Sequence, residues 1–225
     1  MKNNSDRDYV KVTYRNENLT TYPEKLSKYL FNRFGLVKGQ RLLDLGCGRG
    51  EYLNGFKLCG LETFGVDQSS IGETIFKKEK IKIIDMENEQ LPYENETFDV
   101  VFCKSVLEHF YYPEKLVKEI FRVLKNDGIA ISMVPEWESQ WRIFYIDYTH
   151  RTPFSLNSFE EIFLLHGFDN VKVERFRQLP FLWKNKWLNF IVILLGKSTP
   201  WWLRKRSKLL RFSKEVMLLS SAYKR

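Results

Sequence analysis

The sequence predicts an α/β fold, with a mostly parallel sheet of seven strands and helices on both of its faces. Two observations favour this fold. An apolar run from Arg41 stops at a glycine turn, and residues at helical spacing follow, which is how doubly wound sheets begin. Further short apolar runs alternate with helical patterns, and two of them stop at an acidic residue, Asp67 and Asp85.

The composition is that of a globular protein. The chain has 225 residues and a mass of 27.0 kDa, 44% of its residues are hydrophobic, and we expect one domain over residues 1–225. Cys47, Cys59 and Cys103 form no C-x-x-C pair and follow no signal peptide, so we expect a reduced, cytoplasmic protein. No run of 18 or more uninterrupted apolar residues predicts a membrane span.

Positive charge is concentrated near the C-terminus. The formal net charge is +8, but residues 172–225 contain 14 Lys and Arg against 2 acidic residues, a local charge of +12. The preceding residues contain 22 basic and 26 acidic side chains, a local charge of −4. An anionic partner is therefore expected to contact the C-terminal quarter.

A polar arm and a helix precede the first strand, over residues 1–38. Residues 1–20 are polar and charged, and we expect an arm that is frayed or ordered by a ligand. Helical spacing over Tyr22–Phe34 predicts a helix with Thr21 as its N-cap.

The glycine turn lies in the segment RLLDLGCGRGEY, which runs from Arg41 to Tyr52. A dinucleotide-binding G-x-G-x-x-G turn would need glycine where Glu51 stands. The pattern is instead D-x-G-x-G-x-G, formed by Asp44, Gly46, Gly48 and Gly50. It resembles motif I of the class I S-adenosylmethionine-dependent methyltransferases, which release S-adenosylhomocysteine. The resemblance implies that these residues bind the methionine end of the cofactor.

Acidic residues at the ends of the next two strands extend the resemblance. Glu62–Asp67 reads as a strand whose final acid can accept hydrogen bonds from both ribose hydroxyls. A helix over Ser70–Lys80 and a strand over Lys82–Ile84 are expected next.

In the class I methyltransferases an acid after the third strand accepts from the adenine amino group, and Asp85 stands at that position. Met86 is then expected to pack against the adenine ring. The predicted cofactor-binding set also contains Cys47, Gln68 and Lys104.

The segment FDVVFCKSVLEHF, which begins at Phe98, is similar to the methyltransferase group that includes the ubiquinone and menaquinone C-methyltransferases. It predicts a strand over Phe98–Cys103, followed by a helix over Pro113–Leu124. Residues 126–128 are expected to end this helix, and a strand over Ile129–Val134 is expected to follow. The resemblance covers Arg41 to Pro135 and implies a Rossmann-like class I methyltransferase fold with an antiparallel last strand.

Beyond Glu136 the chain reads EWESQWRIFYIDYTHRTPF, an aromatic loop where such sheets bind ligands. Its D-x-T-H-R-x-P-F-S run is similar to bacterial methyltransferases of glycan and surface-polysaccharide pathways. A helix over Ser155–His166, with Ser155 or Asn157 as its N-cap, is expected next.

Two final strands, Phe168–Phe176 and Lys214–Tyr223, are predicted to pair around an insertion over residues 180–212. Within the insertion, an apolar helix is expected over Trp183–Leu195 and a basic helix over Trp202–Leu210. Apolar bulk, tryptophans and clustered positive charge are typical of elements that lie on a membrane surface. A helical lid over the same domain and a dimer interface remain alternatives.

Methyl transfer to oxygen or nitrogen requires a base for the acceptor's proton. His150, with Asp147 to orient it, and His109 are the candidate catalytic residues, whereas His166 at a helix end is expected to be structural. Cys103 is expected to pack in the core. No acidic cluster predicts a divalent-metal site.

We therefore expect an S-adenosylmethionine-dependent methyltransferase that methylates an oxygen of a saccharide or lipid-linked glycan at the inner membrane face. A methyltransferase of quinones or other hydrophobic small molecules is the first alternative. The second alternative is an RNA-binding methyltransferase, or a noncatalytic cofactor-binding protein, that binds phosphates through the basic C-terminal region. The sequence does not decide the oligomeric state.

Overall fold

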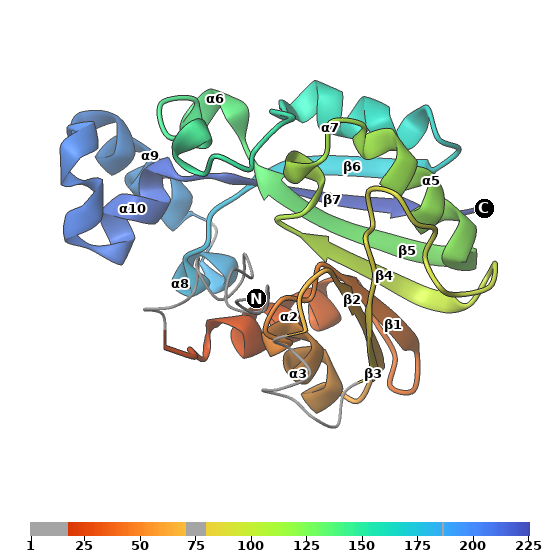
Figure 1. Ribbon diagram of the computed structural model, residues 1–225. Helices are drawn as coiled ribbons and strands as arrows, with labels where there is room; N and C mark the ends of the chain where they lie inside the picture. Colours follow the sequence, from red (N-terminus) through yellow and green to blue (C-terminus); the bar gives the residue numbers. More distant parts are fainter. Residues whose placement is uncertain (1–17, 71–79, 186) are drawn as a thin grey trace, which may run out of the picture. The chain divides into compact units, whose positions relative to one another are not determined.

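The computed structural model describes residues 18–70, 80–185 and 187–225 (Figure 1). Residues 1–17 of the expected arm and the expected helix over Ser70–Lys80, apart from its two end residues, lie outside the described residues. The chain forms two compact units, which we call the first unit, Met1–Cys103 with Arg122–Ile129, and the second unit, Lys104–Phe121 with Ala130–Arg225. One domain over residues 1–225 stays a prediction.

The strands form one seven-stranded sheet in the order β3-β2-β1-β4-β5-β7-β6, and the predicted fold class is confirmed. They are β1 Arg41–Leu45, β2 Glu62–Asp67, β3 Lys80–Ile83, β4 Phe98–Lys104, β5 Leu124–Pro135, β6 Asp169–Phe176 and β7 Met217–Tyr223. The α-helices are α2 Tyr22–Arg33, α3 Glu51–Leu58, α5 Pro113–Val123, α6 Trp137–Gln140, α7 Leu156–Leu164, α8 Pro180–Lys184, α9 Leu188–Ser198 and α10 Lys208–Lys214. The described residues also form the short 3-10 helices η2 Leu107–His109, η3 Phe144–Ile146 and η4 Trp201–Arg206.

In the first unit, β1 is the central strand and is parallel to both of its neighbours. Leu43 lies opposite Phe64 of β2 and Val101 of β4, and β3 adds a further parallel strand beside β2. The apolar residues of β1 are fully buried. This run therefore forms a buried strand, as its sequence predicts.

Helices α2 and α3 pack closely in the first unit because Gly55 has no side chain. A Cβ at Gly55 would lie 2.5 Å from the Ser27 hydroxyl oxygen, closer than non-bonded atoms approach. The predicted helix from Tyr22 ends at Arg33, and Thr21 is its N-cap residue but makes no side-chain capping bond.

In the second unit, β6 and β7 pair antiparallel, with Phe176 opposite Met217 and Asp169 opposite Tyr223. The predicted pair of closing strands is confirmed, although β7 begins at Met217 and not at Lys214. Helix α7 contacts both strands (Figure 1).

Two further strands differ from their expected bounds. Strand β5 begins at Leu124, before Ile129, and its range includes Asn126–Gly128, with Asp127 at a φ of 63°. The N-D-G sequence therefore forms an irregular part of the strand where we expected a stop. The third strand is Lys80–Ile83 and not Lys82–Ile84.

The insertion over residues 180–212 is more broken than its sequence suggests. The predicted apolar helix is two helices, α8 and α9, and the amide of Asn185 donates to the Phe181 carbonyl at the end of α8 (3.3 Å). The predicted basic helix is η4 followed by α10, because Ser207 is extended and its hydroxyl caps Leu210 N–H (3.2 Å). Among the described residues no helix is both long and apolar enough to cross a membrane.

Candidate functional site

The glycine turn after β1 requires its glycines. Gly46, Gly48 and Gly50 have φ values of 66°, 50° and 79°, a left-handed region that costs other residues about 1–2 kcal/mol each. The N–H groups of Gly46 and Cys47 donate to the Val66 carbonyl at the end of β2 (2.8 and 3.1 Å). The turn is therefore fixed against β2, and Gly50 leads directly into α3.

Open space lies beside Gly48. A Cβ built there would meet no described atom within 4 Å. By contrast, a Cβ at Gly65 in β2 would lie 2.8 Å from both the Cys47 sulfur and a Leu53 methyl carbon. Gly65 therefore serves packing beneath the turn, whereas the backbone of Gly48 is accessible to a ligand, which fits the predicted cofactor site.

Asp67, at the end of β2, holds the glycine turn in place. Its Oδ2 accepts from Gly48 N–H (2.6 Å) and its Oδ1 from Ser69 N–H (2.8 Å). A carboxylate oxygen has two lone pairs, so these two contacts do not by themselves preclude ribose recognition. The ribose role itself stays a prediction.

Asp85 follows β3 and forms a local network. Its carboxylate accepts from Glu87 N–H (3.0 Å), the Asn88 amide (2.8 Å) and the Gln68 amide (3.5 Å). The bonds from Asn88 and then from Glu87 N–H lower the pKa of Asp85, so it is ionised at neutral pH and can accept from an amino group. Met86 is buried beside it.

The remaining predicted cofactor residues differ in their surroundings. Asp44 is buried in β1 between Gly65 of β2 and Phe102 of β4. Burial, reinforced by the charges of Asp44 and Asp67, raises the pKa of Cys47, so its thiol is a packing group and not a nucleophile. Lys104 ends β4 in the second unit and contacts the Ser105 hydroxyl (3.4 Å).

In the second unit two segments bring the catalytic candidates together. The Glu108 carbonyl accepts from Arg151 N–H (2.7 Å) and Thr152 N–H (3.0 Å), which fastens the aromatic loop to η2. The rings of His109 and His150 are consequently neighbours, with centroids 4.8 Å apart and planes inclined at 61°.

Hydrogen bonds orient both imidazoles. Thr149 donates its hydroxyl proton to Asp147 Oδ1 (2.6 Å), so its oxygen is left to accept from His109 Nδ1 (2.9 Å). His150 Nδ1 lies 2.7 Å from the Phe144 carbonyl, which can only accept. Both rings therefore have their proton on Nδ1 and their lone pair on Nε2.

Both imidazoles are neutral at physiological pH. Burial and the nearby His150 ring lower the pKa of His109 to about 4. Burial also lowers the pKa of His150, against the opposing effect of Asp147, whose Oδ2 lies 4.0 Å from His150 Nε2. The structure thus brings together the three predicted catalytic residues, whereas His166 lies apart, bonded to the Ile162 carbonyl (2.7 Å).

Sequence reasoning missed Glu108 and Thr149. Glu108 is completely buried, and neither of its carboxylate oxygens has a hydrogen-bond partner within the described part of the chain. Burial raises its pKa to about 8. No pattern marked this acid, because a Leu-Glu-His stretch does not reveal which side chain points inward.

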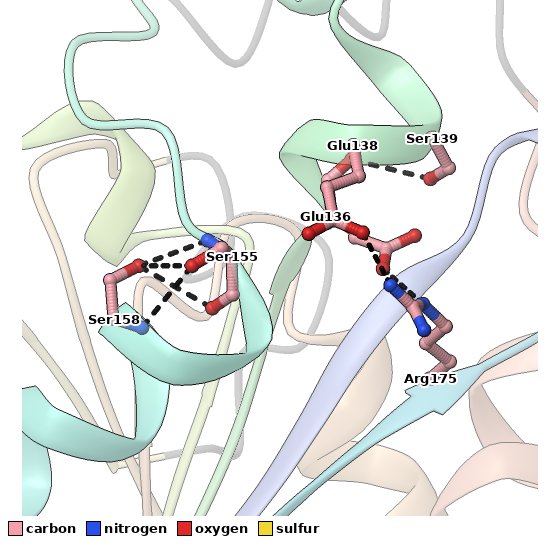
Figure 2. A network of polar contacts seen from close by, with 6 residues as sticks. All are labelled: Glu136, Glu138, Ser139, Ser155, Ser158 and Arg175. Carbon is pink, nitrogen blue, oxygen red and sulfur yellow. Dashed lines mark hydrogen bonds and ion pairs between the residues drawn. The ribbon is translucent and has the colours of Figure 1, made fainter.

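Ion pairs hold the start of the aromatic loop. Figure 2 shows the Arg175 guanidinium of β6 paired with both Glu136, which follows β5, and Glu138 of α6. Figure 2 also shows the reciprocal bonds of Ser155 and Ser158 that begin α7, so Ser155, and not Asn157, is the cap.

Comparisons with known proteins show the family and the fold of this chain. Residues 14–173 match a family model described as a methyltransferase domain. An uncharacterised protein of Methanocaldococcus jannaschii is 31% identical over 84% of this chain and 81% of its own length. A ubiquinone biosynthesis O-methyltransferase of Aliivibrio fischeri is 30% identical over 47% of this chain, and the chain spans 48% of that enzyme.

Solved structures share the fold. A SAM-dependent methyltransferase of Archaeoglobus fulgidus superposes with a TM-score of 0.68 at 20% identity, over 96% of this chain and 100% of that one. The Haemonchus contortus phosphoethanolamine N-methyltransferase 2, solved with S-adenosylhomocysteine, gives 0.64 at 21% identity over 88% of this chain and 52% of that one. This chain belongs to the methyltransferase-domain family, with the fold and cofactor of the class I S-adenosylmethionine-dependent enzymes.

Proposed function

We propose that this protein methylates a hydroxyl oxygen of a saccharide or lipid-linked glycan at a membrane surface, with S-adenosylmethionine as donor. The observation that carries the proposal is the centre formed by His109, His150 and Asp147. It combines two neutral imidazoles and a carboxylate in one place, and a hydroxyl acceptor needs a group that removes its proton.

When bound, S-adenosylmethionine supplies an activated methyl group: its S–CH3 bond breaks as the new O–CH3 bond forms, and the electron pair stays on sulfur. Gly48 and Asp67 hold the donor in this proposal, Gly48 through the open space where a side chain would stand and Asp67 through its carboxylate. The centre of His109, His150 and Asp147 takes the acceptor's proton. Alignment of the acceptor and the methyl group supplies much of the remaining rate enhancement.

An exposed apolar stripe supports a membrane-surface location. Trp187, Phe190, Ile191 and Leu194 follow the spacing of one helical face and are 70%, 67%, 52% and 49% exposed. The opposite face of α9 is packed, since Val192 is buried with Leu179 and other residues of the insertion. Soluble surfaces seldom leave such a stripe uncovered.

Positive charge accompanies the stripe. No acidic residue occurs between Glu174 and Glu215 in the sequence, and Lys205, Arg206 and Lys208 are exposed. The Arg206 guanidinium lies 5.8 Å from the centre of the Trp202 ring, a pairing of the kind found where proteins meet lipid headgroups. Anionic lipid is therefore the favoured partner of this surface.

A screen with donor labelled in its methyl group tests the catalytic proposal. Labelled product is expected with lipid-linked or free saccharides. His150→Gln and His109→Gln should each lower the rate at least about 100-fold, the usual contribution of acid-base groups. His166→Gln is the matched control, because that ring lies outside the cluster and bonds the Ile162 carbonyl of α7. Product formation at the wild-type rate by both former variants would exclude this centre.

Sedimentation with anionic and neutral vesicles tests the membrane proposal. Trp187→Ser with Phe190→Ser should lower binding to anionic vesicles at least about tenfold. Leu58→Ser is the control, because Leu58 is 68% exposed but lies on α3 in the first unit. Unchanged vesicle binding by the double variant would remove the membrane role.

Two alternatives rest on other observations. If the screen labels quinones and not saccharides, the acceptor is a hydrophobic small molecule. The similarity to a ubiquinone biosynthesis O-methyltransferase supports this alternative. Steeply salt-dependent retention of RNA would favour nucleic acid. The uncharged, exposed stripe on α9 favours lipid over RNA.

A further inference from the structure

We infer that Glu108, His109 and His150 bind one divalent transition-metal ion, for which Zn²⁺ is the best match. The three side chains each offer one ligand atom, and these atoms all lie within 4.8 Å of one another. Two imidazole nitrogens and one carboxylate oxygen are a common ligand set for zinc. The sequence predicts no metal site, because the ligands come from two segments that only the fold brings together.

Glu108 gives the strongest indication. Its side chain is completely buried, and among the described residues no donor meets the geometry of a hydrogen bond to either carboxylate oxygen, although the Glu108 and Val106 N–H groups partly offset the rise in pKa that burial causes. A buried carboxylate without partners is costly, and buried charges are normally paired or bound to metals. The backbone of Glu108 is nevertheless held by two short bonds from the aromatic loop, so its inward position is built into the fold. A cation would compensate this carboxylate.

The hydrogen bonds of the two imidazoles are those expected around a metal. A ligating histidine usually donates its other N–H to a carbonyl or to a group linked to a carboxylate. His150 Nδ1 donates to the Phe144 carbonyl, and His109 Nδ1 donates to Thr149, which in turn donates to Asp147. These bonds occupy Nδ1 of each ring, so Nε2 is the nitrogen that would ligate an ion.

The spacing fits an ion after a small adjustment. Zinc bonds of about 2.0–2.2 Å place tetrahedral ligands about 3.4 Å apart, so the present spread of up to 4.8 Å must contract by about 1.4 Å. Mg²⁺ is disfavoured because it prefers oxygen ligands.

Three protein ligands leave one position of a tetrahedral ion open, as in catalytic zinc sites. If the proposed function holds, the acceptor hydroxyl binds there, and the ion lowers its pKa. The imidazoles then act as ligands, and Asp147, whose Oδ2 lies 4.0 Å from His150 Nε2, receives the proton. Only this step rests on the proposed function, whereas metal binding does not.

Metal binding by tag-free protein tests the inference without donor or acceptor. After dialysis against a chelator, Zn²⁺ titration should show one tight site. Co²⁺ should give visible absorption bands of a tetrahedral ion with nitrogen ligands. Glu108→Gln and His150→Gln should each weaken Zn²⁺ at least about 100-fold, whereas His166→Gln, which alters a ring outside the cluster, should bind like wild type.

The melting temperature of Glu108→Gln distinguishes loss of metal binding from unfolding of the variant. It removes a buried ionisable group, so its melting temperature without metal should equal or exceed that of the wild type, while Zn²⁺ should no longer raise it. Absence of a tight site in folded wild type, or equal Zn²⁺ affinity in Glu108→Gln, would overturn the inference. Metal binding without methylation of any saccharide would instead count against the proposed acceptor.

Discussion

Replacing Asp67 with asparagine should both destabilise the glycine turn and weaken cofactor binding. The carboxylate accepts from Gly48 N–H at 2.6 Å and from Ser69 N–H at 2.8 Å. Asparagine has one acceptor oxygen, so one backbone N–H would face an amide N–H instead. Losing one charge-assisted bond at a buried position costs about 1.5–3 kcal/mol, and the free energy of unfolding should fall by that amount.

The same substitution should raise the dissociation constant for S-adenosylmethionine about 10–100-fold, because a neutral amide is a weaker partner for ribose hydroxyls. Urea unfolding gives the first quantity and isothermal titration gives the second. Asp99→Asn is a matched control: that carboxylate also accepts from a backbone N–H, of Arg41, and from the Lys125 ammonium, both at 2.8 Å, away from the glycine turn. Equal losses of cofactor affinity in both variants would refute the specific role of Asp67.

Three further predictions concern the supports of the site. Ser155→Ala should lower the free energy of unfolding by about 1 kcal/mol in urea titrations, because it removes the capping box of α7. Asn157→Ala should change this free energy little. Equal effects of the two substitutions would contradict the assignment of Ser155 as the cap. Arg175→Met should lower the free energy of unfolding by about 3 kcal/mol, because Glu136 is only 2% exposed and loses its cation. Glu138→Gln should lower it by under about 1 kcal/mol, because Glu138 is exposed. A larger loss in Glu138→Gln than in Arg175→Met would contradict this reasoning. Iodoacetamide should alkylate the partly exposed Cys59 before Cys47, because burial suppresses the thiolate of Cys47, and peptide mass spectrometry showing the opposite order would exclude this account.

The start of the fold could be predicted because local chemistry determines it. Gly46, Gly48 and Gly50 occupy backbone conformations that other residues adopt only with strain, so the spacing of the glycines marks the turn directly. Strand β2 has the predicted bounds, Glu62–Asp67, because a short apolar run fits a buried strand and the acid at its end marks where the strand reaches the edge of the sheet.

The insertion was predicted less well because its composition hides its breaks. The apolar pattern of α8 continues through Leu188, yet α8 ends before Asn185. There the Asn185 side-chain amide donates to the carbonyl of Phe181. Likewise, Ser207 begins α10 by capping Leu210, although the surrounding basic residues suggest one continuous helix.

The candidate catalytic residues could be named but not assembled from the sequence. His109 and His150 were found because the chain has only three histidines. Their partnership depends on the two backbone bonds that the Glu108 carbonyl accepts from the aromatic loop, a contact between distant segments. Glu108 itself was missed because the burial of a single acid is a property of packing, which no local pattern reports.

Isothermal titration of the folded protein with S-adenosylmethionine and S-adenosylhomocysteine tests the central claim most directly. The open backbone at Gly48 and the carboxylates of Asp67 and Asp85 predict one site per chain that binds both molecules, and binding weakened by Asp67→Asn but not by Asp99→Asn. Absence of binding to either molecule, in protein whose cooperative unfolding shows that it is folded, would contradict the account.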